Sequence, residues 1–168
     1  MTNHRAGFTL IEILVVVLVV SIIMGVVVGS FTGVDKEQEL RGFAERLALR
    51  IEMARDRALQ RNQEWGLYID EDGVRFAEFD QINAEWLDRV ERPFNNESYT
   101  TSLEIRVKAT EFETQLLGEA KELPEIVLFS SGETTPFEIE IEPTDWATRP
   151  WLLSSDGFSR TDLDRVDI

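Results

Sequence analysis

An apolar run near the N-terminus constrains this chain more than any other feature. It extends over residues 8–28, twenty-one residues interrupted only by Thr9, Glu12, Ser21 and Gly25. A helix of that length crosses a hydrocarbon layer of roughly 30 Å. The rival interpretation is a cleaved secretory signal, but the run is long for one and only a weak small-x-small site follows it. We therefore predict one membrane-spanning helix.

The charges that flank this run predict its orientation. Arg5 precedes the run, whereas Asp35, Glu37 and Glu39 follow it with only Lys36 among them. Because the basic flank of a membrane helix stays in the cytoplasm, the N-terminus should be cytoplasmic and the C-terminal bulk should lie across the membrane.

Composition excludes several kinds of chemistry. The chain has no cysteine, and its only histidine is His4, so disulfides, thiolate metal sites and histidine-dependent catalysis are all but excluded. Residues 65–168 hold 24 acidic and 9 basic side chains, which accounts for the whole net charge of −15 and argues against nucleic acid as a partner. We expect no metal and no cofactor. A membrane-tethered periplasmic enzyme or binding protein that uses carboxylates alone stays as an alternative.

A second helix should follow the apolar run. Its apolar positions recur at spacings of three and four residues, which is typical of an amphipathic helix that buries one stripe. We expect this stripe to pack on a sheet, because its small alanines suit a sheet better than a coiled coil. Joined to the apolar run, the helix would have ~55 residues. The stripe consists of Leu40, Phe43, Leu47, Ile51, Ala54 and Ala58.

Three glycines, Gly25, Gly29 and Gly33, are spaced four residues apart between the two parts of this helix. They could form a close-packing seam between helices. Because each glycine costs about 1 kcal/mol relative to alanine in a helix, they could instead form a soft spot, which we favour.

The remainder of the chain has the pattern of an antiparallel β domain. Residues 65–70 and 74–79 flank a short turn that contains glycine, which predicts a hairpin. Residues 103–108 and 137–142 alternate between apolar and charged side chains, as strands with one wet face do. Shorter strands are expected at 125–129 and 151–154, and loops at 81–102 and 110–124. The predicted fold class is α+β, with the long helix packed on one or two antiparallel sheets.

Glu12 is out of place in an apolar helix. An acidic residue in a membrane segment costs up to about 3 kcal/mol near its centre, so it needs a partner or must reach the interface. If the chain were cut between Gly7 and Phe8, a new ammonium at Phe8 would lie one helical turn from Glu12 and could neutralise it. An interfacial carboxylate that snorkels is the simpler alternative.

Residues 5–12, Arg-Ala-Gly-Phe-Thr-Leu-Ile-Glu, resemble the prepilin peptidase recognition site of the type IV pilin-like superfamily. The resemblance implies cleavage after Gly7, N-methylation of Phe8 and a role for Glu12 in docking subunits into a filament. It divides the chain into a leader (1–7), a transmembrane and filament-core helix (8–33), an amphipathic helix (34–64) and a periplasmic head (65–168).

A second resemblance is narrower. Residues 129–137 (FSSGETTPF), the later Ser155-Asp156-Gly157, residues 55–58 and the 65–79 hairpin are similar to the H-type minor pseudopilins of type II secretion. The resemblance implies a non-catalytic inner-membrane subunit of the periplasmic pseudopilus. Its implied partners are the prepilin peptidase, the other pseudopilins, membrane lipid, and exported substrates or the outer-membrane secretin. Related minor pilins of type IV pili share this domain and stay as the alternative, although the absence of cysteine favours a pseudopilin.

Overall fold

The computed structural model describes residues 10–70, 73–99, 103–109 and 123–166, and for residues 25–35 it describes the backbone alone. The chain divides into two compact units, Met1–Glu39 and Leu40–Ile168. Helix α1 (Leu10–Arg61) contributes residues to both units. Its backbone is helical through Gly25, Gly29 and Gly33, and the two alternatives for these glycines, packing seam and soft spot, stay predictions.

Sheet A has the strand order β3-β2-β1-β5 and is antiparallel throughout. The predicted hairpin is confirmed: Trp65 pairs with Glu78 at one end and Asp70 with Gly73 at the other. Gly73 has a φ of +147° and donates its N–H to the Asp70 carboxylate at 3.1 Å, which closes the turn. The strands of sheet A are β1 (Trp65–Asp70), β2 (Gly73–Asp80), β3 (Glu85–Asp88) and β5 (Ile126–Leu128).

Sheet B has the strand order β4-β6-β7-β8 and is also antiparallel. The alternation of residues 137–142 corresponds to one buried and one wet face, as predicted, because Phe137, Ile139 and Ile141 of β6 are buried and Glu138 of the same strand is exposed. On the wet face, Lys108 of β4 lies 2.9 Å from Glu140 of β6, so opposite charges face each other across the strands. The strands are β4 (Leu103–Ala109), β6 (Phe137–Pro143), β7 (Trp151–Ser155) and β8 (Asp162–Arg165).

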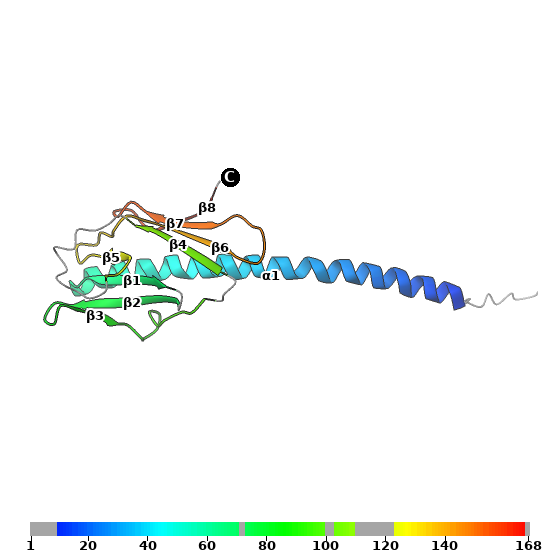
Figure 1. The fold of residues 1–168 in the computed structure, drawn as a ribbon, viewed down its shortest axis with the longest axis horizontal. Helices are drawn as coiled ribbons and strands as arrows, with labels where there is room; N and C mark the ends of the chain where they lie inside the picture. The colour runs from blue at the N-terminus through cyan, green and yellow to red at the C-terminus, as the bar shows by residue number, and fades with distance from the viewer. Residues whose placement is uncertain (1–9, 71–72, 100–102, 110–122, 167–168) are drawn as a thin grey trace, which may run out of the picture. The chain divides into compact units, whose positions relative to one another are not determined.

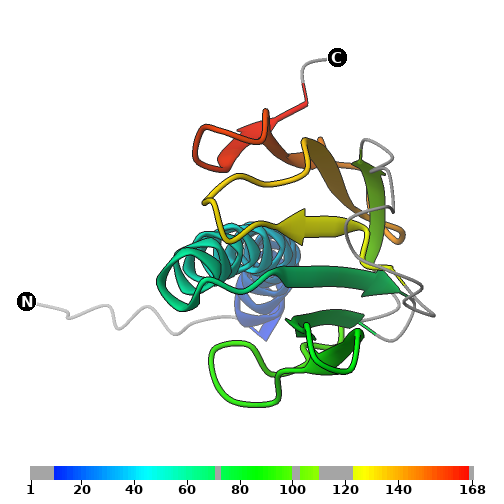
Figure 2. The same cartoon turned by 90° about the vertical axis from the view of Figure 1, so that its left-hand side faces the viewer.

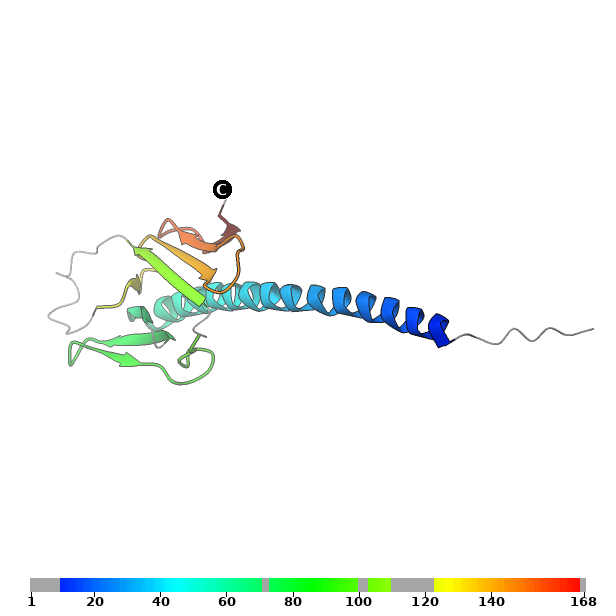
Figure 3. The same ribbon diagram turned by 45° about the vertical axis from the view of Figure 1, so that its right-hand side comes forward.

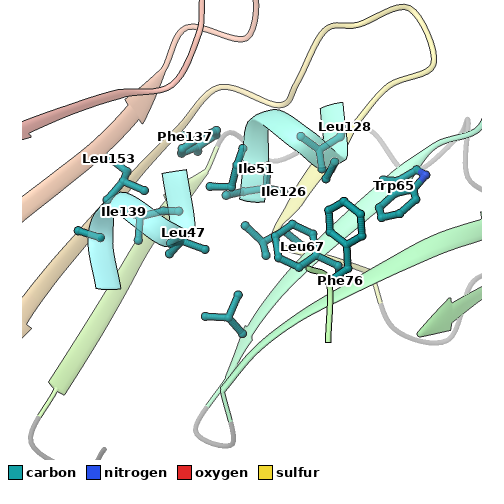
Figure 4. Close-up of a cluster of buried hydrophobic side chains, with 14 of the residues drawn as sticks. Leu47, Ile51, Trp65, Leu67, Phe76, Ile126, Leu128, Phe137, Ile139 and Leu153 are labelled. Carbon is teal, nitrogen blue, oxygen red and sulfur yellow. The ribbon is translucent and has the colours of Figure 1, made fainter. Parts of the chain in front are cut away.

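The two sheets share one hydrophobic core with the part of α1 that belongs to the second unit (Figures 1 and 3). All six residues of the predicted apolar stripe are buried, from Leu40 to Ala58. Figure 4 shows Leu47 and Ile51 of the helix with Ile139 and Leu153 of sheet B and with Leu67 of sheet A. The stripe therefore packs on the sheets of its own chain, as predicted, and the α+β fold class is confirmed.

Two strands correct the sequence analysis. The region 81–102, predicted to be a loop, contains the edge strand β3, in which only Trp86 is even half-buried, so no alternating pattern marks it. The same region also buries Phe94 against Trp65, with 4.7 Å between the ring centroids. Strand β8 was not predicted, because its sequence is charged and its pairing with β7 forms it. Most of the predicted loop 110–124 lies outside the described residues.

Candidate functional site

The first candidate site is the N-terminal part of α1. Thirteen large apolar side chains between Leu10 and Met24 are 48–84% exposed. Soluble proteins rarely expose so much contiguous apolar surface unless it contacts another protein or a membrane. Glu12 lies in the first turn of α1 and is exposed, near the N-terminal end of this apolar surface. Gly7 and Phe8 lie outside the described residues, so their predicted role as a cleavage site stays a prediction.

The polar residue Ser21 in this part of the helix is satisfied locally. Its hydroxyl donates to the carbonyl oxygen of Val17 at 2.7 Å, one turn earlier. A serine that bonds in this way adds little polarity to an apolar helix surface. Across the described residues, no helix reaches both the length and the mean hydropathy of a membrane span.

The second candidate site lies in the second unit, around Arg55 near the C-terminal end of α1. The Arg55 guanidinium donates three hydrogen bonds of 2.5 Å, to the carbonyl oxygens of Gly132, Phe158 and Ser159. A planar guanidinium has five donors in a fixed fork, so one side chain can hold two separate loops at once. We call this set of four residues the Arg55 clasp. In Figure 2 the segment after β5 (yellow) and the β7–β8 connection (orange to red) both lie beside the helix.

The loop after β7 is fixed by its own hydrogen bonds as well. The Asp156 carboxylate accepts the backbone N–H groups of Phe158 at 2.9 Å and Ser159 at 2.7 Å. These bonds favour the charged form and lower the pKa of Asp156. Gly157 has a φ of +93°, and its carbonyl accepts the N–H of Thr134 at 2.8 Å. A side chain at position 157 would place its Cβ 2.6 Å from the Thr134 carbonyl oxygen, so only glycine fits.

Two further contacts join these loops to the helix. The Glu52 carboxylate accepts both the N–H and the hydroxyl of Thr161 at 2.8 Å, and Glu64 accepts the Ser130 hydroxyl at 3.0 Å. The three short motifs that resembled H-type pseudopilins, at 55–58, 129–137 and 155–157, are thus brought together in space. The sequence resemblance singled out these segments but gave no reason for their presence, whereas the contacts show that each one builds the same cluster.

The contacts in this cluster join loops to the helix. The donors of Arg55 that form the clasp point at backbone carbonyls, and the Ser130 hydroxyl donates to the Glu64 carboxylate. Over the described residues, no group of three or more histidine, cysteine, aspartate or glutamate side chains could hold a metal ion. The arrangement can hold two loops in fixed positions; one of them carries Phe158, whose side chain is 72% exposed.

Sequence reasoning missed one buried charge. Arg50 is 6% exposed, donates to the Glu97 carboxylate and to the Asn95 carbonyl at 2.7 Å each, and lies 4.8 Å from the centre of the Phe76 ring. Burial lowers the pKa of Arg50, and Glu97 opposes that effect. The signal available in the sequence was the spacing of Arg46, Arg50, Arg57 and Arg61, which puts four cations on one face of the helix.

Comparison with known proteins gives two family matches. Residues 2–28 match the prokaryotic N-terminal methylation motif, and residues 44–157 match the type II transport protein GspH. The first match spans Gly7, Phe8 and Glu12. The second includes Arg55 and Gly132 of the Arg55 clasp and ends at Gly157, directly before Phe158.

Relatives extend over nearly the whole chain. It is 32% identical to the type II secretion system protein H of Pseudomonas aeruginosa, with 96% of this chain and 95% of that protein covered. It is 24% identical to the type II secretion system protein H of Aeromonas hydrophila, with 97% and 96% covered.

Solved structures share the fold. The minor pseudopilin EpsH from the type 2 secretion system of Vibrio cholerae matches with a TM-score of 0.59 at 20% identity, over 76% of this chain and 96% of that one. E. coli GspH matches with a TM-score of 0.57 at 19% identity, over 74% and 87%. With a family model over more than half of the residues and a 32% identical full-length relative, this chain belongs to the GspH family of type II transport proteins, the H-type minor pseudopilins of type II secretion.

Proposed function

We propose that this chain is a non-catalytic subunit of the type II secretion pseudopilus, held in the bacterial inner membrane by residues 8–28 with its head in the periplasm. The observation that carries the proposal is the apolar surface of α1 between Leu10 and Met24, which contains one carboxylate, Glu12. Such a surface is stable only in lipid or against the helices of other subunits.

Maturation forms part of the proposal. The prepilin peptidase would cut between Gly7 and Phe8, and Phe8 would then be N-methylated. The match of residues 2–28 to the N-terminal methylation motif supports this assignment. The new ammonium at Phe8 and the Glu12 carboxylate would neutralise each other, either within one subunit or between neighbouring subunits.

The head supplies contacts of a different kind. Its loops are fixed by the Arg55 clasp, so they can present a surface to other pseudopilins with little loss of conformational entropy on binding. Contacts with exported substrates or with the outer-membrane secretin would use the same periplasmic surface.

The deciding experiment is complementation. A bacterium that lacks its own H subunit should recover secretion of an exported protein when it expresses this chain, and the chain should co-purify with the other pseudopilins from detergent extracts. Loss of surface pili in the deletion strain, with secretion unchanged, would instead support a minor pilin of a type IV pilus. Restored secretion without any pseudopilin partner would contradict the structural role.

A further inference from the structure

A groove lies between the helix and the chain segment that follows β3. Its volume is about 230 Å³, and it is lined by Met53, Asp56, Arg57, Gln60, Pro93 and Phe94. The floor is rigid, because Phe94 is 4% exposed and its ring packs edge-on against Trp65 and Phe76, at centroid distances of 4.7 and 5.6 Å. The groove can therefore receive one apolar side chain without rearrangement.

Arginines are frequent on the two chain segments that line this groove, in a protein whose net charge is −15, and Arg57 is itself part of the lining. On the helix, Arg46, Arg50, Arg57 and Arg61 fall within about 60° of one another at 100° per residue. Beyond β3, Arg89 lies over the Trp65 ring, and Arg92 directly precedes the groove residue Pro93. These six are among the 14 arginines of the chain.

The arginines divide into those that the fold uses and those that it leaves available. Glu97 pairs with Arg46 and Arg50, at 3.2 and 2.7 Å, and Glu78 pairs with Arg61 and Arg89, at 3.4 and 3.1 Å. Arg57 and Arg92 are exposed, and neither forms an ion pair within the part of the chain that the structure describes. Asp56 also lines the groove, and its negative charge would repel a bound carboxylate. Such a carboxylate must therefore lie away from Asp56.

We propose that this groove docks an acidic segment of a neighbouring pseudopilin, with an apolar side chain of that segment above Phe94 and its carboxylates on Arg57 and Arg92. The inference rests on the proposed function, because it requires a neighbouring subunit. Charge complementarity selects the occupant: two unpaired guanidiniums beside an apolar floor fit an acidic peptide better than a cationic or purely apolar one. The rest of the acidic head repels such a segment and so directs it to the groove.

The test uses the full-length protein in its own membrane. The photo-crosslinking residue p-benzoylphenylalanine is placed at position 60 in the groove, or at position 13 on the apolar part of α1 as a reference. Each is combined with the wild-type arginines, with Arg57→Glu plus Arg92→Glu, or with Arg160→Glu. Arg160 is a matched control, because it is exposed and forms no ion pair within the described residues.

The expected result is a product from position 60 with another pseudopilin, attached through an acidic segment of that protein. The double reversal should reduce this product about tenfold, as the loss of two charge pairs and the added repulsion imply, and Arg160→Glu should leave it unchanged. The product from position 13 should stay constant in every variant, which shows that the protein still reaches the membrane and its neighbours there.

Three results would overturn the inference while the proposed function stands. They are a groove product that the double reversal does not reduce, a product with a second copy of this chain or through a non-acidic segment, and no product from position 60 while position 13 still crosslinks. The loss of products from both positions in the wild-type background would contradict the proposed function and the docking inference with it.

Discussion

Arg50 and Glu97 form an ion pair across the edge of the core, with 2.7 Å between Nη1 and Oε2. The Arg50 side chain is 8% exposed and that of Glu97 is 28% exposed. Because Arg50 also donates to the Asn95 carbonyl, it holds the irregular segment that contains Asn95 and Glu97 against α1 at two points. The same segment contains Pro93 and Phe94, which line the groove beside the helix, so the ion pair holds the groove in place as well as the fold.

Removing one partner of this pair should be costly. Arg50→Met should lower the free energy of unfolding by about 3 kcal/mol, because it leaves Glu97 and the Asn95 carbonyl without their buried donor. Arg46→Met removes an exposed partner of the same carboxylate and should cost less than about 1 kcal/mol. The measurement is urea unfolding of residues 34–168, which include the whole unit Leu40–Ile168. Equal losses of unfolding free energy in the two variants would contradict the prediction that the buried Arg50 contributes more to stability than the exposed Arg46.

The Arg55 clasp gives a second stability prediction. Arg55→Lys keeps the charge but loses the fork geometry, so it should lower the free energy of unfolding by about 2 kcal/mol and loosen both loops. Gly157→Ala should cost at least as much, because its Cβ would meet the Thr134 carbonyl at a strained φ. Hydrogen exchange should show faster exchange at Thr134 and Ser159 in both variants. Unchanged exchange at these amides would mean that the strands alone hold the loops.

The sequence predicted those elements in which the regular spacing of apolar residues coincides with the face that is buried. The stripe from Leu40 to Ala58 and the alternation of β6 each place one apolar face on a single core, so their pattern is sufficient. β3 and β8 gave no such signal, because they are edge strands formed by pairing with β2 and β7 rather than by burial of their own side chains.

The candidate sites likewise include one part that the sequence predicted and others that it did not. The motif of residues 5–12 was recognisable because its residues are contiguous, although the structure describes only the last part of it. The Arg55 clasp joins a side chain to backbone groups up to 104 residues away. Because every residue has a backbone carbonyl, the sequence does not indicate which carbonyls accept these hydrogen bonds. The Arg50–Glu97 pair was missed because one-dimensional patterns do not show which charge a fold buries.

The loop after β7 should respond to acid. Hydrogen bonds from Ser159 and Phe158 lower the pKa of Asp156 below its ordinary value of 3.8. A group whose pKa is lowered by folding stabilises the folded loop above its unfolded pKa, and this contribution disappears as the pH falls through the folded pKa. Amide exchange at Phe158 and Ser159, corrected for intrinsic rates, should therefore accelerate as the pH falls below the ordinary value of 3.8 and through the lower pKa of the folded state. Asp156→Asn should abolish this pH dependence, and its persistence in that variant would assign the effect to another carboxylate.

Maturation gives a prediction about Gly7. Replacement of Gly7 by alanine or a larger residue should leave the leader attached, because the cut is expected directly after this glycine. Mass spectrometry of the protein extracted from membranes should find Phe8 as the N-terminus of the wild type and Met1 or Thr2 in the variant. A wild-type chain that begins at any residue other than Phe8 would contradict the cleavage site.

Substitution of Glu12 should affect membrane insertion and assembly differently. In a lone subunit the Phe8 ammonium of the same chain can serve as a counter-ion of this carboxylate, whereas in a filament the ammonium of an adjacent subunit can serve and favours one axial register. Glu12→Leu removes a charge whose burial costs up to about 3 kcal/mol, so the variant should insert at least as well and still be cleaved after Gly7. It should co-purify less efficiently with the other pseudopilins.

A matched variant identifies the cause of that loss. Gln is nearly isosteric with Glu but uncharged, so Glu12→Gln should resemble Glu12→Leu if the charge docks the subunit, and the wild type if the polar shape is sufficient. The readouts are co-purification of full-length subunits from detergent extracts and secretion of an exported protein, each normalised to the amount of cleaved protein. The loss should be partial, because contacts of the head also hold the subunit. Wild-type association in both variants would show that Glu12 is only a tolerated interfacial carboxylate.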